Sequence, residues 1–348
     1  MPGVADMSGE HGGQLHRAAA RYGIPVTDWL DLSTGISPWS WPVPSLPETV
    51  WQRLPDEEDG LVASCREALS LSPEAGCLPV AGSQAALQTL PSLRRPCRVG
   101  VPVPGYREHA LAWQRQGHTV VPLAPDTIED ALQGLDVLVW LQPNNPSGLW
   151  LPLERLLAWQ EQLAARGGWL VVDEAFVEAS AAPSLVGEVG RPGLIVFRSL
   201  GKFYGLAGAR AGLMLAEPAL CDAVQRSQGP WALSHPARHI MARALLDRHW
   251  QAQQQARLRL ARVALDRVLS DAGFEPAGGC DLFAWCPEAK AGVWAERLAR
   301  QGILVRAFDT PSALRFGLPG DEAARARLCR DGYCASSRCR ALWYSCFN

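Results

Sequence analysis

One lysine of the sequence lies in a glycine-rich turn between two apolar runs. The turn reads SLGKFYGLAGAR over residues 199–210, with Lys202 near its start and Arg210 at its end. Apolar residues 194–197 precede it and 211–215 follow it, which predicts two buried strands. A lysine held near apolar surface loses hydration of its charged form, so the free amine that a Schiff-base lysine needs is easier to reach. Arg210 carries a fork of donors that suits a phosphate, although an ordinary surface loop would also explain this stretch alone.

Two more polar side chains follow predicted buried strands. Asn145 lies in the segment NNPSG (144–148), after the apolar run 136–141, and Asp173 ends the apolar run 169–172. Helical stretches separate these runs, and the alternation predicts a parallel sheet covered by helices. Open α/β sheets bind ligands at the carboxyl ends of their strands, so the lysine, the amide and the carboxylate are all placed for a ligand site.

A further segment has the composition of an anion site. Residues 78–81 form an apolar run, and Gly82, Ser83 and Gln84 follow it at the start of a predicted helix. A glycine and a hydroxyl beside free backbone N–H groups can bind a phosphate. The alternative is that Ser83 simply caps the helix.

The segments NNPSG, VVDEAF and SLGK…GLAGAR, in this order and spacing, resemble those of the aminotransferase-like pyridoxal-phosphate enzymes of fold type I. The resemblance runs from about residue 11 to about residue 330. It implies an α/β fold in which a mostly parallel central sheet has helices on both faces and a smaller α+β lobe is attached. It also implies a pyridoxal 5′-phosphate cofactor and a homodimer with sites at the interface.

Within this resemblance, Lys202 matches the residue that binds the cofactor aldehyde and later moves protons at the substrate Cα. Asp173 matches the carboxylate that keeps the ring nitrogen protonated, and Asn145 matches the donor to the ring's phenolic oxygen. Tyr106 matches the aromatic residue that stacks on the ring, with a core tyrosine as the alternative. The phosphate-binding residues that the resemblance implies are Gly82, Ser83, Gln84, Ser199 and Arg210.

Three positions depart from the family pattern, and each lacks a hydroxyl group. Phe176 and Leu54 stand where many relatives have tyrosine, and Gly201 replaces a frequent hydroxyl residue beside Lys202. We expect these changes to alter cofactor affinity or the choice of reaction. The core set of lysine, aspartate and asparagine is present.

The opening of the chain most resembles the threonine-phosphate decarboxylases of cobalamin biosynthesis. The segments HGG (11–13) and LDLSTGISP (30–38) match parts that, in this branch, close over the substrate phosphate. The positions concerned are His11, Gly12, Gly13, Ser33, Thr34 and Gly35, where Gly35 replaces a frequent asparagine. Arg315 matches the family arginine that binds the substrate carboxylate, a role that suits its bidentate fork.

The implied reaction removes CO2 from L-threonine O-3-phosphate and gives (R)-1-amino-2-propanol O-phosphate. The bond that breaks is the one held perpendicular to the cofactor ring, and no motif reports which bond this is. An aminotransferase acting on a phosphorylated amino substrate such as histidinol phosphate uses the same residues and stays open as an alternative. A fold retained as a binding or regulatory module is the non-enzymatic alternative.

The pattern divides the chain into three parts. Residues 1–55 form a proline-rich arm and part of a small domain, 56–240 a large cofactor-binding domain, and 241–348 a small α+β domain. Residues 236–273 read as one long helical region. After about residue 328 the helical period breaks in a cysteine-containing tail, to which we assign no function.

Composition argues against several classes of partner and site. The 348 residues carry a net charge of −2, which does not favour nucleic acid or an anionic membrane as partner. No apolar run reaches the roughly 18 residues of a membrane span, and the N-terminus lacks a secretory pattern, so we expect a cytoplasmic protein. The ten cysteines are then expected to be reduced thiols, and their spacing matches no metal-binding pattern.

Overall fold

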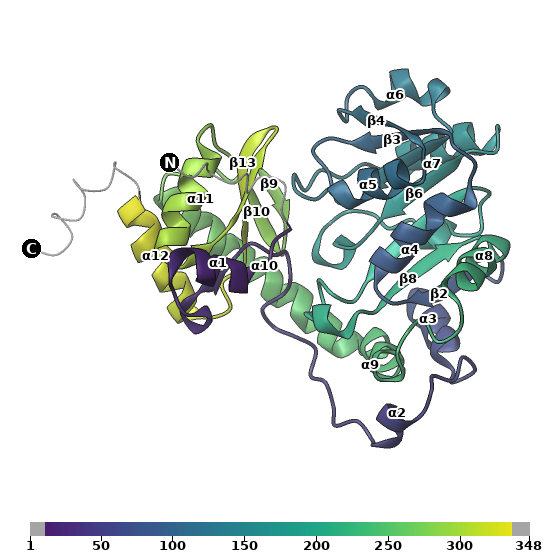
Figure 1. Cartoon of the computed structure of the whole chain (residues 1–348), viewed down its shortest axis with the longest axis horizontal. Helices are drawn as coiled ribbons and strands as arrows, with labels where there is room; N and C mark the ends of the chain where they lie inside the picture. The colour runs from purple at the N-terminus through teal and green to yellow at the C-terminus, as the bar shows by residue number, and fades with distance from the viewer. Residues whose placement is uncertain (1–10, 336–348) are drawn as a thin grey trace, which may run out of the picture. The chain divides into compact units, whose positions relative to one another are not determined.

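The computed structural model describes residues 11–335, with side chains as far as residue 330, and divides the chain into two compact units (Figure 1). The larger unit holds Trp39–Gln254, and the smaller unit holds the segments on either side of it. The sequence places these boundaries near residues 55 and 240. The proline-rich segment groups with the larger unit because the Trp41 N–H donates to the Tyr204 carbonyl at 2.9 Å.

A seven-stranded sheet forms the centre of the larger unit, in the order β2-β8-β7-β6-β5-β3-β4. The strands are β2 (Gly76–Val80), β3 (Arg98–Pro102), β4 (Thr119–Leu123), β5 (Val137–Leu141), β6 (Trp169–Asp173), β7 (Leu194–Ser199) and β8 (Gly212–Ala216). Strand β8 runs antiparallel to both of its neighbours, and the other neighbouring pairs are parallel. The predicted mostly parallel sheet is therefore confirmed.

Both faces of this sheet are covered because its central strands are apolar throughout. Helices α4 (Ser83–Thr89), α5 (Arg107–Arg115) and α8 (Pro218–Gln228) contribute to one core cluster with alternate residues of the strands. Helix α7 (Leu153–Ala164) packs on the other face, where Trp159 meets Trp140 of β5 with ring centroids 5.7 Å apart. The remaining helices of this unit are α2 (Thr49–Gln52), α3 (Leu61–Leu69), α6 (Ile128–Ala131) and α9 (His235–Leu246).

The smaller unit contains a four-stranded antiparallel sheet in the order β12-β13-β10-β9. Its strands are β9 (Gly278–Cys280), β10 (Phe283–Pro287), β12 (Arg306–Asp309) and β13 (Ser312–Gly317). A separate parallel pair joins β1 (Leu30–Asp31) to β11 (Ile303–Leu304), and the helices are α1 (Leu15–Tyr22), most of α10 (Arg248–Asp271), α11 (Ala291–Arg300) and α12 (Glu322–Ala335). Neighbouring strands β11 and β12 thus belong to two different sheets.

Two helical predictions need correction. The helical region predicted over 236–273 is two helices, because Asp247 interrupts it between α9 and α10 (Arg248–Asp271). Asp247 Oδ1 accepts a hydrogen bond from the Trp250 N–H at 3.0 Å, and so caps the second helix. The break predicted after residue 328 is also wrong for the backbone, since α12 continues to Ala335. The rest of the cysteine-containing tail lies outside the described residues.

An ion pair between buried Arg238 and Asp59 ties α9 to the loop before α3. Arg238 Nε and Nη2 donate to the two carboxylate oxygens of Asp59, at 2.8 and 2.6 Å. Burial alone would raise the pKa of Asp59, but its hydrogen bonds, led by those from Arg238, outweigh burial and lower the pKa. A carboxylate with a depressed pKa adds stability above its unfolded pKa and loses this contribution as the pH falls through the folded pKa.

We predict that Asp59→Asn lowers the free energy of unfolding by roughly 1–3 kcal/mol near neutral pH, the value of hydrogen bonds to a charged group. The loss should shrink as the pH falls below the folded pKa of Asp59, because the wild-type carboxyl group is then protonated too. Urea unfolding at neutral and acidic pH measures both effects. Asp222→Asn, at an exposed position on α8, is the control and should change little. An equal loss at both pH values would contradict the assigned ion pair.

Candidate active site

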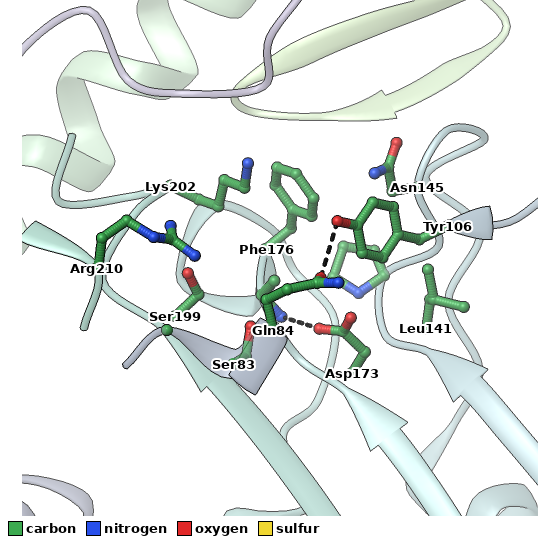
Figure 2. A pocket seen from close by; sticks show the side chains of 13 residues that line it. Ser83, Gln84, Tyr106, Leu141, Asn145, Asp173, Phe176, Ser199, Lys202 and Arg210 are labelled. Atoms are coloured by element: carbon green, nitrogen blue, oxygen red, sulfur yellow. Dashed lines mark hydrogen bonds between the residues drawn. The ribbon is translucent and has the colours of Figure 1, made fainter. Parts of the chain in front are cut away.

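One pocket of the larger unit brings together all the residues predicted to bind the cofactor (Figure 2). It is lined by Gly82, Ser83, Gln84, Tyr106, Asn145, Asp173, Ser199, Lys202 and Arg210, with Leu141, Pro143, Ala175 and Phe176 completing the wall. These side chains come from the carboxyl ends of β5, β6 and β7, from the loops that follow them, and from the starts of α4 and α5. The pocket therefore lies where parallel strands end, as expected for an α/β sheet.

A buried carboxylate forms one end of the pocket. Asp173 Oδ2 lies 3.0 Å from Nε2 of His109, and Asp173 Oδ1 accepts a hydrogen bond from the Ala175 N–H at 3.0 Å. The His109 ring stacks on Phe197 of β7, with centroids 6.3 Å apart. These contacts fix the carboxylate before any ligand arrives. His109 was not identified from the sequence, and its only signal there is a spacing of three residues from Tyr106, which the fold turns into neighbouring positions at the start of α5.

Two adjacent asparagines after β5 have different environments. Asn144 is buried: its Nδ2 donates to the Pro104 carbonyl at 3.0 Å and its Oδ1 accepts from Ser147 Oγ at 3.0 Å. These bonds hold the loop in shape. Asn145 instead lines the pocket, where Figure 2 shows its amide beside the ring of Tyr106. The first asparagine thus builds the loop that presents the second.

The predicted lysine turn connects two buried antiparallel strands, β7 and β8. The Gly201 N–H donates to Ser199 Oγ at 3.1 Å and closes the start of the turn. Lys202 Nζ lies 5.6 Å from the ring centroid of Phe176, which is itself buried. The amine therefore enters the pocket beside an aromatic face, an arrangement that favours a cation–π contact.

Hydrogen-bond donors gather at the other end of the pocket. Gly82 has a left-handed φ of +74°, and a Cβ atom there would lie 2.8 Å from Nη2 of Arg210, so the guanidinium group packs directly on this glycine. Gly82 holds the cap position of α4, and Ser83 is the first helical residue. The alternative that Ser83 caps the helix is therefore wrong. Its hydroxyl, the hydroxyl of Ser199 and the Arg210 guanidinium line the pocket together.

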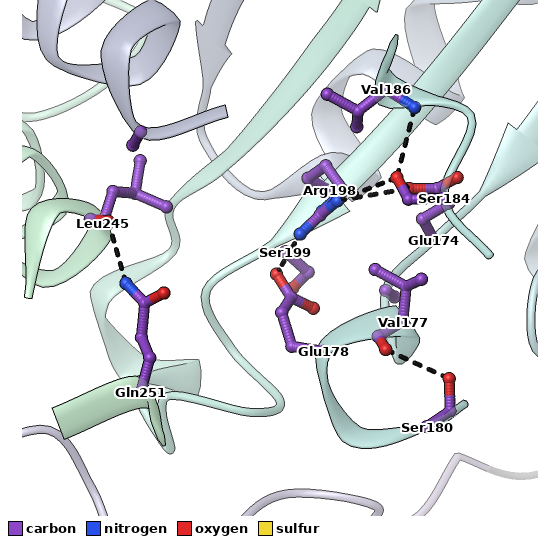
Figure 3. A network of polar contacts seen from close by, with 12 residues as sticks. Glu174, Val177, Glu178, Ser180, Ser184, Val186, Arg198, Ser199, Leu245 and Gln251 are labelled. Atoms are coloured by element: carbon purple, nitrogen blue, oxygen red, sulfur yellow. Dashed lines mark hydrogen bonds and ion pairs between the residues drawn. The ribbon is translucent and has the colours of Figure 1, made fainter. Parts of the chain in front are cut away.

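A buried charge network lies beside these residues (Figure 3). Glu174 is completely buried, and its Oε1 accepts from the Leu185 N–H at 2.6 Å. Its Oε2 accepts from Ser184 Oγ at 2.6 Å and from Arg198 Nη1 at 3.2 Å. Arg198 Nη2 donates to Glu178 Oε1 at 2.7 Å. Burial would lower the pKa of Arg198, but the carboxylates of Glu178 and Glu174 outweigh it and raise the pKa, so the guanidinium group stays charged.

This network adjoins the pocket in sequence. Asp173 and Ser199 line the pocket, while their immediate neighbours Glu174 and Arg198 are ion-paired to each other. Successive side chains alternate across a strand, so each strand end sends one residue to the pocket and one to the ion pair. The ion pair therefore holds the ends of β6 and β7 at a fixed spacing.

A second pocket lies in the smaller unit and includes some of the residues predicted to bind substrate. Its charged and polar lining consists of His11, Gln14, Arg17, Arg21, Ser33 and Arg306, beside Gly12. A Cβ atom on Gly12 would lie 2.3 Å from the Ser33 carbonyl oxygen. The Gly13 N–H donates to Ser33 Oγ at 2.8 Å, and that hydroxyl donates to Asp31 Oδ1 at 2.6 Å. Because its proton is already used, Ser33 shapes this segment and has no proton left to donate to a ligand.

Arg315 is buried on β13 and donates from Nη2 to the Ser33 carbonyl at 2.7 Å. Arg306 on β12 is directly opposite it in the ladder. Burial, followed by the charge of Arg306, lowers the pKa of Arg315 to about 9, which leaves it charged at neutral pH. Two like charges in opposite positions repel, and an anion would relieve the repulsion. Arg306 was not identified from the sequence because only the strand register pairs it with Arg315. Thr34 is half-buried and Gly35 buried in the segment after Ser33.

Comparison with known proteins gives consistent relatives. The family description "Aminotransferase class I and II" matches residues 57–331. A threonine-phosphate decarboxylase from Pseudomonas aeruginosa is 50% identical, covering 92% of this chain and 96% of that protein. A second threonine-phosphate decarboxylase, from a Sinorhizobium species, is 40% identical, covering 91% of this chain and 96% of that protein. The solved histidinol-phosphate aminotransferase of Sinorhizobium meliloti, in complex with pyridoxal-5′-phosphate, shares the fold with a TM-score of 0.80 at 21% identity, covering 93% and 94%.

Two kinds of feature are absent from the part of the chain that the structure describes. Between residues 11 and 330, His, Cys, Asp and Glu side chains form no cluster of three that could bind a metal ion. Within the same range, no helix combines the length and the apolar composition that a membrane span needs.

We predict that Gly82→Ala displaces the Arg210 guanidinium group and weakens binding of pyridoxal phosphate to the apo-protein. The left-handed φ should also destabilise the fold by about 1–2 kcal/mol. Absorbance titration measures the affinity, and thermal unfolding measures the stability. Affinity for pyridoxal, which lacks the phosphate, should change much less.

Gly134→Ala is the matched control, because a Cβ atom at Gly134 meets nothing within 4 Å and its φ is ordinary. It should leave affinity and stability close to wild type. If Gly82→Ala weakened pyridoxal and pyridoxal phosphate equally, the assignment of this end of the pocket to phosphate would be wrong.

Proposed function

The chain belongs to the family of class I and II aminotransferases, and from that membership we propose that it binds pyridoxal 5′-phosphate and decarboxylates L-threonine O-3-phosphate. The product is (R)-1-amino-2-propanol O-phosphate, an intermediate of cobalamin biosynthesis. The observation that carries the proposal is 50% identity to a threonine-phosphate decarboxylase along almost the whole of both chains. The likeness to the aminotransferase structure, at 21% identity, supports the fold alone.

The pocket of the larger unit fits this cofactor chemically. It offers a fixed carboxylate at one end, hydroxyl and guanidinium donors at the other, and one lysine amine between β7 and β8. When bound, the cofactor ring draws in the electrons that remain at the substrate Cα after a bond breaks. The Asp173 carboxylate, oriented by His109, holds a proton at the ring nitrogen. Asn145 would donate to the phenolic oxygen, and the ring of Tyr106 would pack against the cofactor ring.

Lys202 has two roles in this proposal. Its amine is the group that would hold the aldehyde carbon of the cofactor, and the same amine would be placed to move a proton at the substrate Cα. In the overall reaction the Cα–carboxyl bond breaks, CO2 leaves, and a proton is added to the same carbon. Atoms and charge therefore balance without an oxidant or a second substrate, which distinguishes this reaction from transamination.

We assign the anionic groups of the substrate to the smaller unit. Arg315 and its neighbour Arg306 supply positive charge suited to a carboxylate or phosphate. The segment from His11 to Gly13 and the residues from Ser33 to Gly35 are proposed to surround the substrate phosphate. In this arrangement Ser33 acts by holding Gly12 and Gly13 in place.

The purified chain with pyridoxal phosphate and threonine phosphate should release CO2 without any keto-acid acceptor. Gas evolution and mass spectrometry of the amino-alcohol phosphate measure the reaction. Histidinol phosphate with 2-oxoglutarate is the comparison, and we expect it to be turned over at least about 100-fold more slowly, since the substrate groups differ in more than one hydrogen bond. Amino transfer without CO2 release would overturn the proposed reaction but not the cofactor.

Lysine substitution gives a clean test of cofactor attachment, because Lys202 and Lys290 are the only two lysines in the sequence. Borohydride reduction of the loaded enzyme should add the cofactor's mass to the peptide that contains Lys202. Lys202→Ala should lose this product and nearly all decarboxylation, whereas Lys290→Ala should keep both. A reduced adduct on Lys290 in the wild type would sink the assignment.

We further propose a homodimer, with a second copy of the chain on the apolar groove of the larger unit. Trp51, Leu54 and Trp231 line this groove and are 68%, 64% and 51% exposed. Large apolar side chains gathered in this way are typical of a protein interface. The cytoplasmic location stays a prediction.

Sedimentation velocity should give a dimer for the wild type and a monomer for the double variant Trp51→Asp/Leu54→Asp, because two charges would be buried without partners. Leu260→Asp is the control, since Leu260 is 74% exposed on α10 and is not part of the groove. A wild-type monomer at micromolar concentration would contradict the proposed interface.

A further inference from the structure

A chain of hydrogen bonds leads from the pocket to a buried carboxylate that the mechanism above does not use. Tyr106 Oη donates to Gln84 Oε1 at 3.1 Å, a bond that Figure 2 marks. The other end of this amide, Gln84 Nε2, donates to Glu108 Oε2 at 3.2 Å. Gln88 Nε2 donates to the same oxygen at 3.1 Å. Glu108 is only 8% exposed, so these amides replace the water that its carboxylate would otherwise bind.

The chemistry of the groups fixes the direction of every bond in this chain. A carboxylate accepts hydrogen bonds and does not donate them, so Gln84 must turn its NH2 group toward Glu108. The amide oxygen of Gln84 then faces Tyr106, and an amide oxygen can only accept. The Tyr106 hydroxyl therefore has to donate to Gln84. Its proton points along the chain of bonds, and the phenol oxygen offers lone pairs to any other partner.

We propose that Glu108 is a positioning residue. It fixes the direction in which the Tyr106 hydroxyl donates its hydrogen bond, and through Tyr106 it fixes the position of the bound cofactor ring. The inference rests on the proposed binding of pyridoxal phosphate in this pocket. It also corrects the expected role of Gln84, whose side chain is engaged at both ends and orients Tyr106. One of the two amide N–H groups is used by Glu108, so the second amide N–H and the backbone N–H of Gln84 are the donors left for the phosphate.

The arrangement has a consequence for what Tyr106 can bind. With its proton committed to Gln84, the phenol oxygen accepts a hydrogen bond from an ammonium or N–H group and repels a carboxylate or phosphate oxygen. Replacing Glu108 by glutamine removes the requirement that the Tyr106 hydroxyl donate to Gln84, because a glutamine can present either its oxygen or its NH2 group to Gln84. The Tyr106 hydroxyl is then no longer held in one direction.

A double-mutant cycle tests the proposal, with the dissociation constant of pyridoxal phosphate for the full-length apo-protein as the readout. We expect Glu108→Gln to raise this constant about fivefold, the value of one neutral hydrogen bond. In a Tyr106→Phe background there is no hydroxyl to orient, so the same substitution should change the constant by less than about twofold. A merely structural role would give the same loss in both backgrounds, and that result, or no loss in either, would overturn the proposal.

Two further variants keep the test decisive. Gln84→Met cuts the chain at its middle and should reproduce the effect of Glu108→Gln, with the same dependence on Tyr106, if the first variant does not fold. Gln88→Met removes the second amide from Glu108 and leaves the Gln84 bond, so it should stay within about twofold of wild type. No substrate is used, so failure of decarboxylation and failure of this inference are separate results. If the wild-type protein bound no pyridoxal phosphate, both the proposed function and the positioning role of Glu108 would be wrong.

Discussion

The pocket depends on the ion pairs that the buried guanidinium group of Arg198 makes with Glu174 and Glu178 inside the larger unit. Two charges taken out of water are costly unless their hydrogen bonds are complete, and removing one partner of such a pair typically costs about 3–5 kcal/mol. Here Glu174 accepts from a backbone N–H, a hydroxyl and Arg198, while Glu178 takes the second arm of the fork. The two carboxylates are served by two separate nitrogens of the planar guanidinium group, whose fixed geometry holds the carboxylates at a set separation.

The ion-pair network affects the pocket because its members are next in sequence to residues that line the pocket. Asp173 and Ser199 each precede or follow a member of the ion pair by one residue, and they serve opposite ends of the pocket. The ladder between β6 and β7 stops near this point, with Asp173 opposite Phe197 as its last pair. One residue further along, the Glu174 N–H still donates to the Phe197 carbonyl at 2.9 Å, and the side-chain ion pair adds a second connection between the two strands at this point.

Sequence reasoning located the elements well where the signal is local. The strands with apolar runs, and the polar residues directly after them, follow from periodicity and from the rule that ligands bind at strand ends. Pairs of residues that are distant in the sequence and that only the fold brings together could not be predicted. His109 meets Asp173 across 64 positions, and Arg306 meets Arg315 only through a ladder register. The capping of α10 by Asp247 was missed because helix formers on both sides hide the interruption.

The structure explains two of the three positions at which this chain lacks a hydroxyl group. Phe176 is buried against the Lys202 side chain, so it contributes an apolar wall where a tyrosine would contribute a donor. At Gly201 a Cβ atom would lie 3.3 Å from Ala207 Cα and 3.4 Å from Ser199 Oγ, which leaves little room for a hydroxyl side chain. Leu54 stays 64% exposed, and nothing within its own unit explains it.

The packing of Arg210 on Gly82, at one end, and the His109-bound carboxylate, at the other, give the pocket a built-in polarity. A phosphorylated ring that entered in reverse would set its anion against Asp173, so only one head-to-tail alignment is stable. With both ends fixed, a bound ring could not turn over, and the same face of the ring would always lie toward Tyr106. The side from which a proton reaches the substrate Cα would thus be decided by two charges at the ends of a sheet, before any bond of the substrate changes.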